Sequence, residues 1–252
     1  MFPAFIPSNP SEVSLHCFSS IMKAKAIKLY DNGLIANGDK GYRSVLGTQG
    51  VTEGSYYYEV TILNPSSESL NIPSNPIPPS APMLEPLLTT SNMLYLETHD
   101  TISIHFNSAH TRIGFATAQT DLELPIGADS YSYSYRDLDG GVFHEGYINE
   151  YADSYGYNDI IGCLIRLQPQ KPKIRGVIEE GPVVSEGSEI HYFKNGEHMG
   201  CAFSNIYEGC YYPAVGLYQY ARVEINMTPN LLYPKILKQY NAKPFFNNHK
   251  YF

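Results

Sequence analysis

The chain has 252 residues and a formal net charge of -8 at pH 7. Its 43% of hydrophobic residues is enough for the core of one large domain. The acidic balance argues against a broad surface for nucleic acid, which would need clustered Lys and Arg. Abundant tyrosine (22), proline (18) and glycine (20), together with few long helical periods, favour an all-β fold.

The sequence predicts three parts. Residues 1–25 form an N-terminal segment that is broken by prolines and lacks the basic start and apolar run of a signal peptide. A β domain follows over residues 26–234, and residues 235–252 form a C-terminal tail. No stretch approaches the length of a membrane span, so we expect no membrane partner.

Within the β domain, strand-like segments alternate with turn residues. The predicted strands are residues 26–30, 34–36, 42–46, 55–63, 111–117, 159–167, 189–194, 197–203, 212–218 and 221–227. Asp31, Asn32 and Gly33 predict one hairpin, and Asn195 with Gly196 gives the strongest hairpin signal of the chain. Because no crossover helices separate the strands, we expect antiparallel pairing in two packed sheets.

Two segments interrupt this pattern of strands. Residues 64–101 are rich in proline and serine and are predicted to form an extended insertion. Residues 168–187 form a second connection of mixed charge. Both are expected at the surface, where unpaired backbone groups can bind water.

The run HTRIGFATAQTDLELPIGADSYSYSYR, residues 110–136, places two arginines on either side of a turn. Arg112 lies in one strand-like segment and Arg136 closes another, in which tyrosines alternate with serines. Pro125 and Gly127 bend the loop between them. This order predicts a binding rim on a β scaffold. The alternative is that both arginines are solvated surface charges in weak ion pairs.

The sequence offers little for catalysis. It has no nucleophile elbow, phosphate-binding loop, HExxH or paired-cysteine motif. The four cysteines have no zinc-like spacing to each other or to histidine, so we expect reduced thiols and no metal or other cofactor. His144 is the best candidate for a structural hydrogen bond. Carboxylates that lie close in sequence, such as Asp137 and Asp139, are interpreted as solvated charges, although a sandwich hydrolase or lectin stays open as an alternative.

Several motifs together resemble a known family. They are GYRSVLGTQGVTEGSYYYEVTI, RIGFAT, LPIGADSYSYSYR, FHEGYINEYADSYGYNDIIGCLI, HYFKNGEHMGCAFSNIYEGCYYPAVGLY and VEINMTPNLLYP, in this order. This order resembles a SPRY (B30.2) domain, a concanavalin-like two-sheet β-sandwich. More narrowly it is similar to the SPRY domain of the trithorax-group "absent, small, or homeotic discs" (Ash/Bre-type) subunit of COMPASS histone methyltransferase complexes. Tyr56, Phe115 and Tyr135 stand where the family usually has tryptophan.

The resemblance implies a non-catalytic subunit of a nuclear complex that methylates lysine four of histone H3. In the family the domain binds an acidic segment of a β-propeller subunit, and the pair orders the SET-domain methyltransferase. Tyr42, Arg112, Pro125 and Arg136 match the partner-binding pocket. Arginine forks suit carboxylates, and the tyrosine and proline supply an apolar floor.

The chain also departs from the family pattern. Ala128 and Leu138 replace a pocket tyrosine and a pocket lysine, and Asp137 and Asp139 can partly neutralise Arg136. The DNA-contacting region of the family is not matched, so direct nucleic-acid binding is not predicted. The tail ILKQYNAKPFFNNHKYF does not have the pattern of a long amphipathic helix, which makes a Dpy-30-type dimer a doubtful partner and favours packing of the tail on the sandwich. The alternative function is a SPRY adaptor of another pathway, such as substrate recruitment to a ubiquitin ligase.

Overall fold

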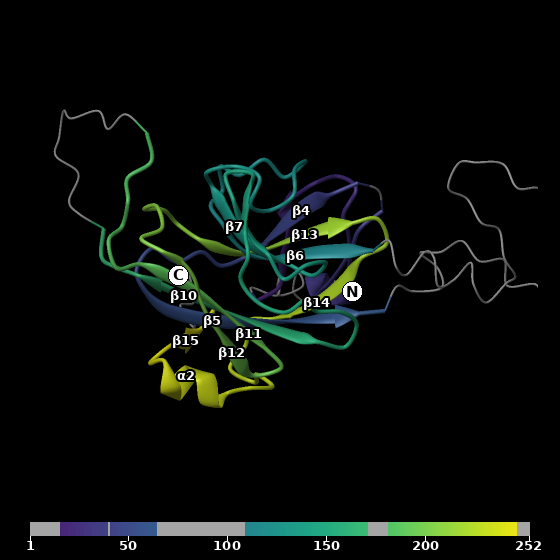
Figure 1. Ribbon diagram of the computed structural model, residues 1–252. Coiled ribbons are helices and arrows are strands. Elements are labelled where there is room, and N and C mark those ends of the chain that lie inside the picture. The colour runs from purple at the N-terminus through teal and green to yellow at the C-terminus, as the bar shows by residue number, and fades with distance from the viewer. Residues whose placement is uncertain (1–15, 40, 65–108, 171–180, 246–252) are drawn as a thin grey trace, which may run out of the picture.

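The computed structural model describes residues 16–39, 41–64, 109–170 and 181–245. These residues form two sheets that pack face to face, as Figure 1 shows. All strand pairs are antiparallel apart from one short parallel pair near the C-terminal end of this region. The expected all-β sandwich is therefore confirmed. Among the described helices none is both long and apolar enough to span a membrane.

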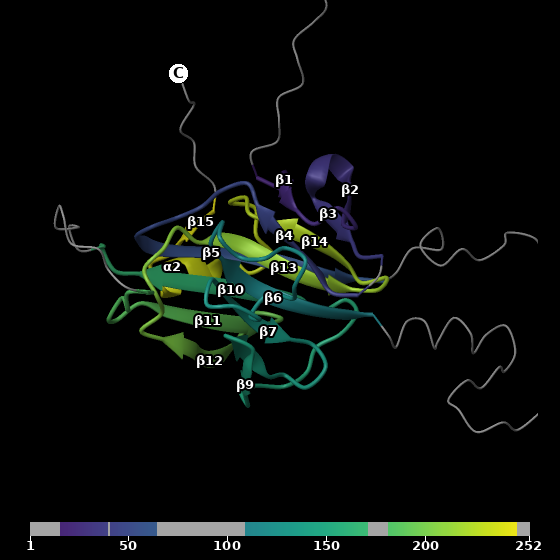
Figure 2. The ribbon, with the colours of Figure 1, turned by 90° about the horizontal axis from the view of Figure 1, so that it is seen from above.

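The first sheet has seven strands. Their order across the sheet is β1 (Phe18–Lys23), β4 (Arg43–Gly47), β13 (Tyr212–Tyr218), β6 (His110–Ala116), β7 (Ser132–Arg136), β8 (Val142–His144) and β9 (Tyr147–Asn149). Figure 2 shows β6 and β7 side by side, with β9 at the edge. Strands β1, β8 and β9 were not predicted. All three are short or irregular, and β9 is exposed along its whole length, so none shows the alternation of a half-buried strand.

The second sheet has eight strands. Seven follow the order β12 (Glu197–Ser204), β11 (Glu189–Lys194), β10 (Ile160–Leu167), β5 (Gly54–Leu63), β14 (Arg222–Asn226), β3 (Ile35–Asn37) and β2 (Lys28–Tyr30). The eighth, β15 (Lys243–Pro244), pairs with β5. Both predicted hairpins are confirmed. A 3-10 turn, η1 (Asp31–Gly33), joins β2 to β3 with three successive positive φ angles, and Asn195 and Gly196 join β11 to β12 with φ of 52° and 83°.

The main core fills the space between the sheets and is rich in tyrosine. Tyr58 of β5 meets Phe115 of β6 edge to face, with ring centroids 5.4 Å apart. Tyr135 of β7 is also fully buried and packs against Tyr192 of β11. Phe115 and Tyr135, which stand at family tryptophan positions, are thus core residues, whereas Tyr56 is only partly buried.

The C-terminal segment packs its helix on the outer face of the eight-stranded sheet, and its last described residue reaches the core between the sheets. Helix α2 (Lys235–Gln239) lies on the side of that sheet away from the first sheet (Figure 1). The buried carboxylate of Glu59 accepts hydrogen bonds from the backbone N–H groups of Leu232 and Tyr233, at 2.7 and 2.8 Å. Phe245 is 1% exposed and packs against Tyr58. The predicted packing of the tail on the sandwich is confirmed as far as Phe245.

The proposed domain boundaries stay a prediction. The seven-stranded sheet includes β1, which begins before residue 26 and pairs with β4. The predicted insertion at residues 64–101 lies almost wholly outside the described residues, and so does the middle of the connection at residues 168–187.

Candidate functional site

The two arginines of the predicted pocket are direct neighbours across strands β6 and β7. Arg112 and Arg136 face each other in the register of this pair, so both side chains leave the same face of the sheet. That face lies outside the main core, because the alternating residues Ile113 and Tyr135 point inward. Sequence order thus translates directly into spatial contact.

A phenylalanine of the next strand completes the arrangement. The guanidinium carbon of Arg112 lies 3.8 Å from the ring centroid of Phe143 in β8, and that of Arg136 lies 4.5 Å from the same centroid. Both cations therefore use one aromatic ring as a support, within the range of cation–π attraction. The ring of Tyr42 lies 5.2 Å from the guanidinium of Arg112. Both arginines thus lie on Phe143, which the sequence analysis missed, and Tyr42 lies beside Arg112.

The fourth predicted pocket residue, Pro125, belongs to the loop that covers the base of this cluster. Its neighbour Ile126 is buried, and the Ile126 carbonyl accepts hydrogen bonds from Arg112 Nη1 at 3.3 Å and Ser134 Oγ at 2.7 Å. Gly127 donates its N–H to Ser132 Oγ at 2.8 Å. The serines that alternate with the tyrosines in β7 are therefore buried anchors of the loop.

Gly127 is required at this bend. Its φ is +89°, and a Cβ atom there would lie 2.6 Å from the carbonyl oxygen of Phe143. A larger residue would displace either the loop or the strand that carries Phe143. The Pro-Ile-Gly turn thus sets the position of the aromatic support as well as that of Arg112.

The two arginines differ in their exposure. Arg112 is 8% exposed, and its buried Nε atom has no hydrogen-bond partner among the described residues. Burial lowers its pKa, while Tyr42 opposes this shift. Arg136 is partly exposed and forms a two-pronged ion pair with Asp139, in which Nε donates to Oδ1 at 2.9 Å and Nη2 donates to Oδ2. This hydrogen bonding holds the pKa of Asp139 below its usual range. The site thus contains the buried guanidinium of Arg112 next to the partly exposed guanidinium of Arg136, which already pairs with Asp139.

Of the two acids expected to neutralise Arg136, only Asp139 pairs with it. Asp137 Oδ2 instead accepts the N–H of Thr111 at 3.0 Å and lies 3.4 Å from Nδ1 of His110. Burial raises the pKa of Asp137 to about 6, and His110 opposes this shift. Asp137 lines a separate hollow of about 250 Å³. It is therefore a buried group with its own partners, which corrects its interpretation as a solvated charge.

Ala128 and Leu138, the positions at which the sequence departs from the expected pocket pattern, lie in two different turns near the arginines. Leu138 lies in the turn between β7 and β8 and is 59% exposed. Ala128 is half-buried and donates its N–H to the carbonyl of Pro125 at 3.1 Å. An apolar side chain thus occupies the rim beside Arg136.

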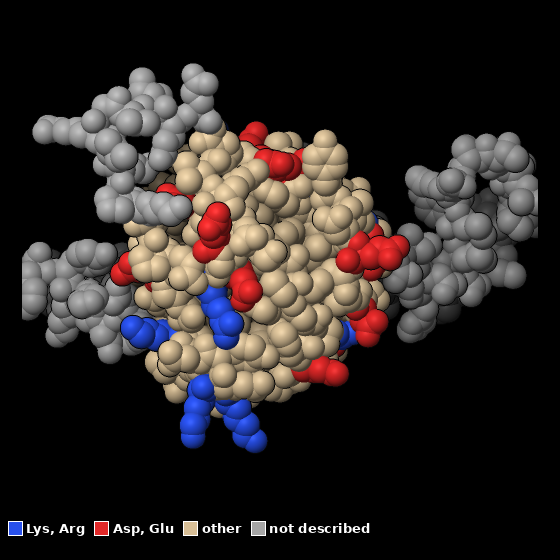
Figure 3. All heavy atoms as spheres, turned by 60° about the vertical axis from the view of Figure 1, so that its left-hand side comes forward, with Lys and Arg blue, Asp and Glu red and all other residues tan. Residues whose placement is uncertain are grey.

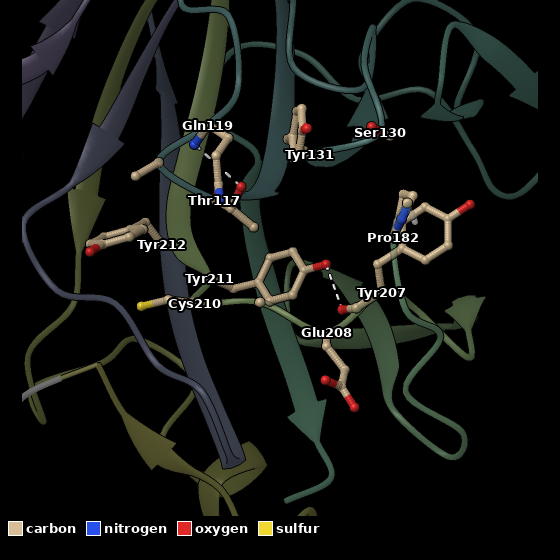
Figure 4. A pocket seen from close by; sticks show the side chains of 13 residues that line it. Thr117, Gln119, Ser130, Tyr131, Pro182, Tyr207, Glu208, Cys210, Tyr211 and Tyr212 are labelled. Atoms are coloured by element: carbon tan, nitrogen blue, oxygen red, sulfur yellow. Dashed lines mark hydrogen bonds between the residues drawn. The ribbon is translucent and has the colours of Figure 1, made fainter. Parts of the chain in front are cut away.

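A larger hollow of about 730 Å³ lies elsewhere on the molecule (Figure 4). Residues that line it include Thr117, Gln119, Tyr131, Tyr207, Glu208 and Tyr211. Among the described residues that line it none is Lys or Arg, and Glu208 contributes a carboxylate. On the face drawn in Figure 3, basic side chains gather near the lower edge while acidic ones are spread over the rest.

His144 has the structural role predicted for it. Its Nδ1 lies 2.9 Å from the carbonyl oxygen of Ser132, and its ring stacks on Tyr133 with centroids 3.8 Å apart. The imidazole thus ties β8 to β7 behind the arginine pair.

Comparison with known proteins agrees with the fold. The SPRY domain model matches residues 101–171. The crystal structure of the SPRY domain of human HERC1 superposes with a TM-score of 0.52 at 19% identity, over 82% of this chain and 96% of that one. A two-sheet antiparallel sandwich with these motifs defines a SPRY domain, and this chain contains one.

Sequence similarity extends beyond the generic domain. The chain is 27% identical to the Set1/Ash2 histone methyltransferase complex subunit ASH2 of Drosophila melanogaster, over 88% of this chain and 37% of that protein. It is 24% identical to the subunit ash-2 of Caenorhabditis elegans, over 81% of this chain and 35% of that protein. The similarity to Ash2 subunits agrees with the resemblance that the motif order indicated. The chain spans little more than a third of the length of these relatives.

Proposed function

We propose that this chain is a non-catalytic, nuclear subunit of a Set1/COMPASS-type histone H3 lysine-four methyltransferase complex. Arg112 and Arg136 bind an acidic segment of a β-propeller subunit, and the resulting pair orders a SET-domain methyltransferase. The observation that carries the proposal is the support of both guanidinium groups by the single ring of Phe143. The similarity to ASH2 over most of the chain supports the class of complex.

The two cations have different roles in this proposal. Arg136 is exposed enough to meet a ligand, and its fork geometry suits a carboxylate. Arg112 is buried, so its charge acts over a short distance on whatever Arg136 binds, and its stacking keeps Phe143 in place. An incoming carboxylate takes the place of Asp139 on Arg136, or shares the guanidinium with it.

This competition makes the proposal testable with substitutions of opposite effect. Arg136→Ala removes the binding group and should weaken an acidic peptide by about 1.5–3 kcal/mol. Asp139→Asn removes the internal competitor and should strengthen the same peptide by up to about 1 kcal/mol. Arg166→Ala is the matched control, because Arg166 also pairs with a carboxylate but belongs to the other sheet.

The binding measurement uses the purified chain and a fluorescent peptide rich in Asp and Glu, with the corresponding Asn and Gln peptide as reference. Affinity is measured at low and high salt, because a charge-based contact weakens with ionic strength. Equal affinity of wild type, Arg136→Ala and Asp139→Asn for the acidic peptide would show that the site is not the arginine pair.

A second experiment tests the complex itself. The tagged chain is expressed in its own cells, and the bound proteins are identified from wild type and from Arg136→Ala. Recovery of a propeller subunit and a SET-domain methyltransferase with wild type, and their reduction with the variant, supports the proposal. Recovery of ubiquitin-ligase components instead would favour the SPRY adaptor of another pathway.

A further inference from the structure

A second cluster of chemically active side chains lies on the other sheet, far from the arginines in sequence. Glu189 and His191 lie two residues apart on β11 and therefore share a face, and Cys201 of β12 lies opposite His191. One oxygen of Glu189, one ring nitrogen of His191 and the sulfur of Cys201 all lie within 4.8 Å of one another. These three atoms come from the outer face of the eight-stranded sheet.

A shift in strand register brings Cys201 to this face. Near the hairpin, Phe193 pairs with His198, a register that would place Gly200 opposite His191. The register shifts by one residue between these pairs, and Gly200 has a φ of +105°. Cys201 rather than Gly200 therefore lies opposite His191. The linear spacing of histidines and cysteines, from which we expected no metal, does not reveal this.

The donor atoms match the preferences of zinc. Thiolate, imidazole and carboxylate are its three common protein ligands, and three of them with an open fourth position is an established zinc arrangement. In a tetrahedral zinc site the ligand atoms lie about 3.3–3.8 Å apart. His191 Nε2 and Glu189 Oε2 are already 3.1 Å apart. The sulfur of Cys201 lies within 4.8 Å of both atoms, so it has to move by at most about 1–1.5 Å, which side-chain rotation provides.

The surroundings of the cluster also suit a metal site. A metal on His191 Nε2 leaves the N–H at Nδ1 free to donate a hydrogen bond. Nε2 of His198, 3.1 Å away, accepts this bond, which fixes the orientation of the His191 ring. Arg166 Nη1 lies 3.6 Å from Oε2 of Glu189 and orients the carboxylate. Cys201 is exposed, so an ion can enter and the fourth position faces solvent.

We propose that Glu189, His191 and Cys201 bind one Zn²⁺ ion, with water in the fourth position. The ion replaces the thiol proton of Cys201 and any proton on His191 Nε2, and both protons pass to solvent. Because His191 and His198 lie beside Tyr240, which follows helix α2, zinc also fastens the two outer strands next to the C-terminal segment. The ion stabilises the folded chain, since it binds that state preferentially.

The first test is a zinc titration of the full chain, reduced and stripped of metal, in competition with a chromogenic chelator. The expected result is one zinc per chain. Cys201→Ser should weaken the affinity by more than about tenfold. The matched control is Cys210→Ser, because Cys210 is also partly accessible but lies outside the cluster. Unchanged affinity in Cys201→Ser, or no competition by the wild-type chain, would overturn the site.

Two further measurements guard against a variant that fails to fold. In the wild-type chain, saturating zinc should slow alkylation of Cys201 by about tenfold or more while leaving that of Cys210 unchanged, as read by mass spectrometry. Glu189→Gln changes a partly exposed residue and should also lower zinc affinity. Cys201 alkylation that is indifferent to zinc contradicts the proposal, whatever the variants show.

Discussion

The two arginines of the pocket should differ sharply in what they contribute to folding. The perturbation is Arg112→Ala compared with Arg136→Ala. Both remove the same side chain from neighbouring positions of one strand pair, but the structure buries only the first. The comparison therefore separates a buried side chain that supports the fold from a partly exposed one.

For Arg112, the lost cation–π contact with Phe143 amounts to about 1–2 kcal/mol in a desolvated setting. The hydrogen bond to the Ile126 carbonyl adds about 1 kcal/mol, because that oxygen keeps its bond from Ser134. Loss of packing by the buried stem adds about 1–2 kcal/mol. Relief of the buried, unpaired Nε offsets about 1–2 kcal/mol, which leaves a net loss of about 2 kcal/mol.

For Arg136, the ring contact and the ion pair with Asp139 are partly exposed to water. Such pairs contribute less than about 1 kcal/mol. The assay is urea unfolding of the three proteins, followed by tyrosine fluorescence, with the midpoint compared at constant denaturant slope. Losses that agree within about 0.3 kcal/mol would refute the reasoning, because they would mean that burial does not distinguish the two side chains.

Three other substitutions test the surroundings of the site and the tail. Gly127→Ala should cost about 2–4 kcal/mol, because the residue has positive φ and its Cβ would meet the Phe143 carbonyl; an unchanged urea midpoint would contradict the strain. Asp137 should lower the free energy of unfolding by about 1–3 kcal/mol as the pH rises from about 4 to about 7, because folding raises its pKa from 3.8 to about 6 and the folded state holds that proton more tightly. Asp137→Asn should remove this contribution, so the difference in unfolding free energy between wild type and variant should change with pH; identical pH profiles would count against it. Phe245→Ala should lower stability by about 3–5 kcal/mol in a calorimetric scan, since its ring is buried against Tyr58; a loss below about 1 kcal/mol would mean that the tail is not part of the core.

The strands and hairpins followed from the sequence because their signals are local. Alternation of apolar and polar residues places Tyr58, Val60 and Ile62 on one face of β5, and Asn195-Gly196 can adopt the positive φ angles of a tight turn. Strands β8 and β9 lack these signals. Their pairing depends on neighbours that only the folded sheet supplies.

The candidate site was also predictable only as far as its signals are local in sequence. The order of Arg112, Pro125, Gly127 and Arg136 along the chain was enough to predict two cations beside one turn. Strand pairing decided that Phe143 supports both of them, and the covering loop decided that Arg112 is buried. A shift in register likewise brings Cys201 opposite His191. Local backbone geometry sets the face to which each side chain points, and so it can be read from residues that are close in sequence. Which side chains share that face depends on the pairing and register of distant strands, and only the tertiary structure decides these.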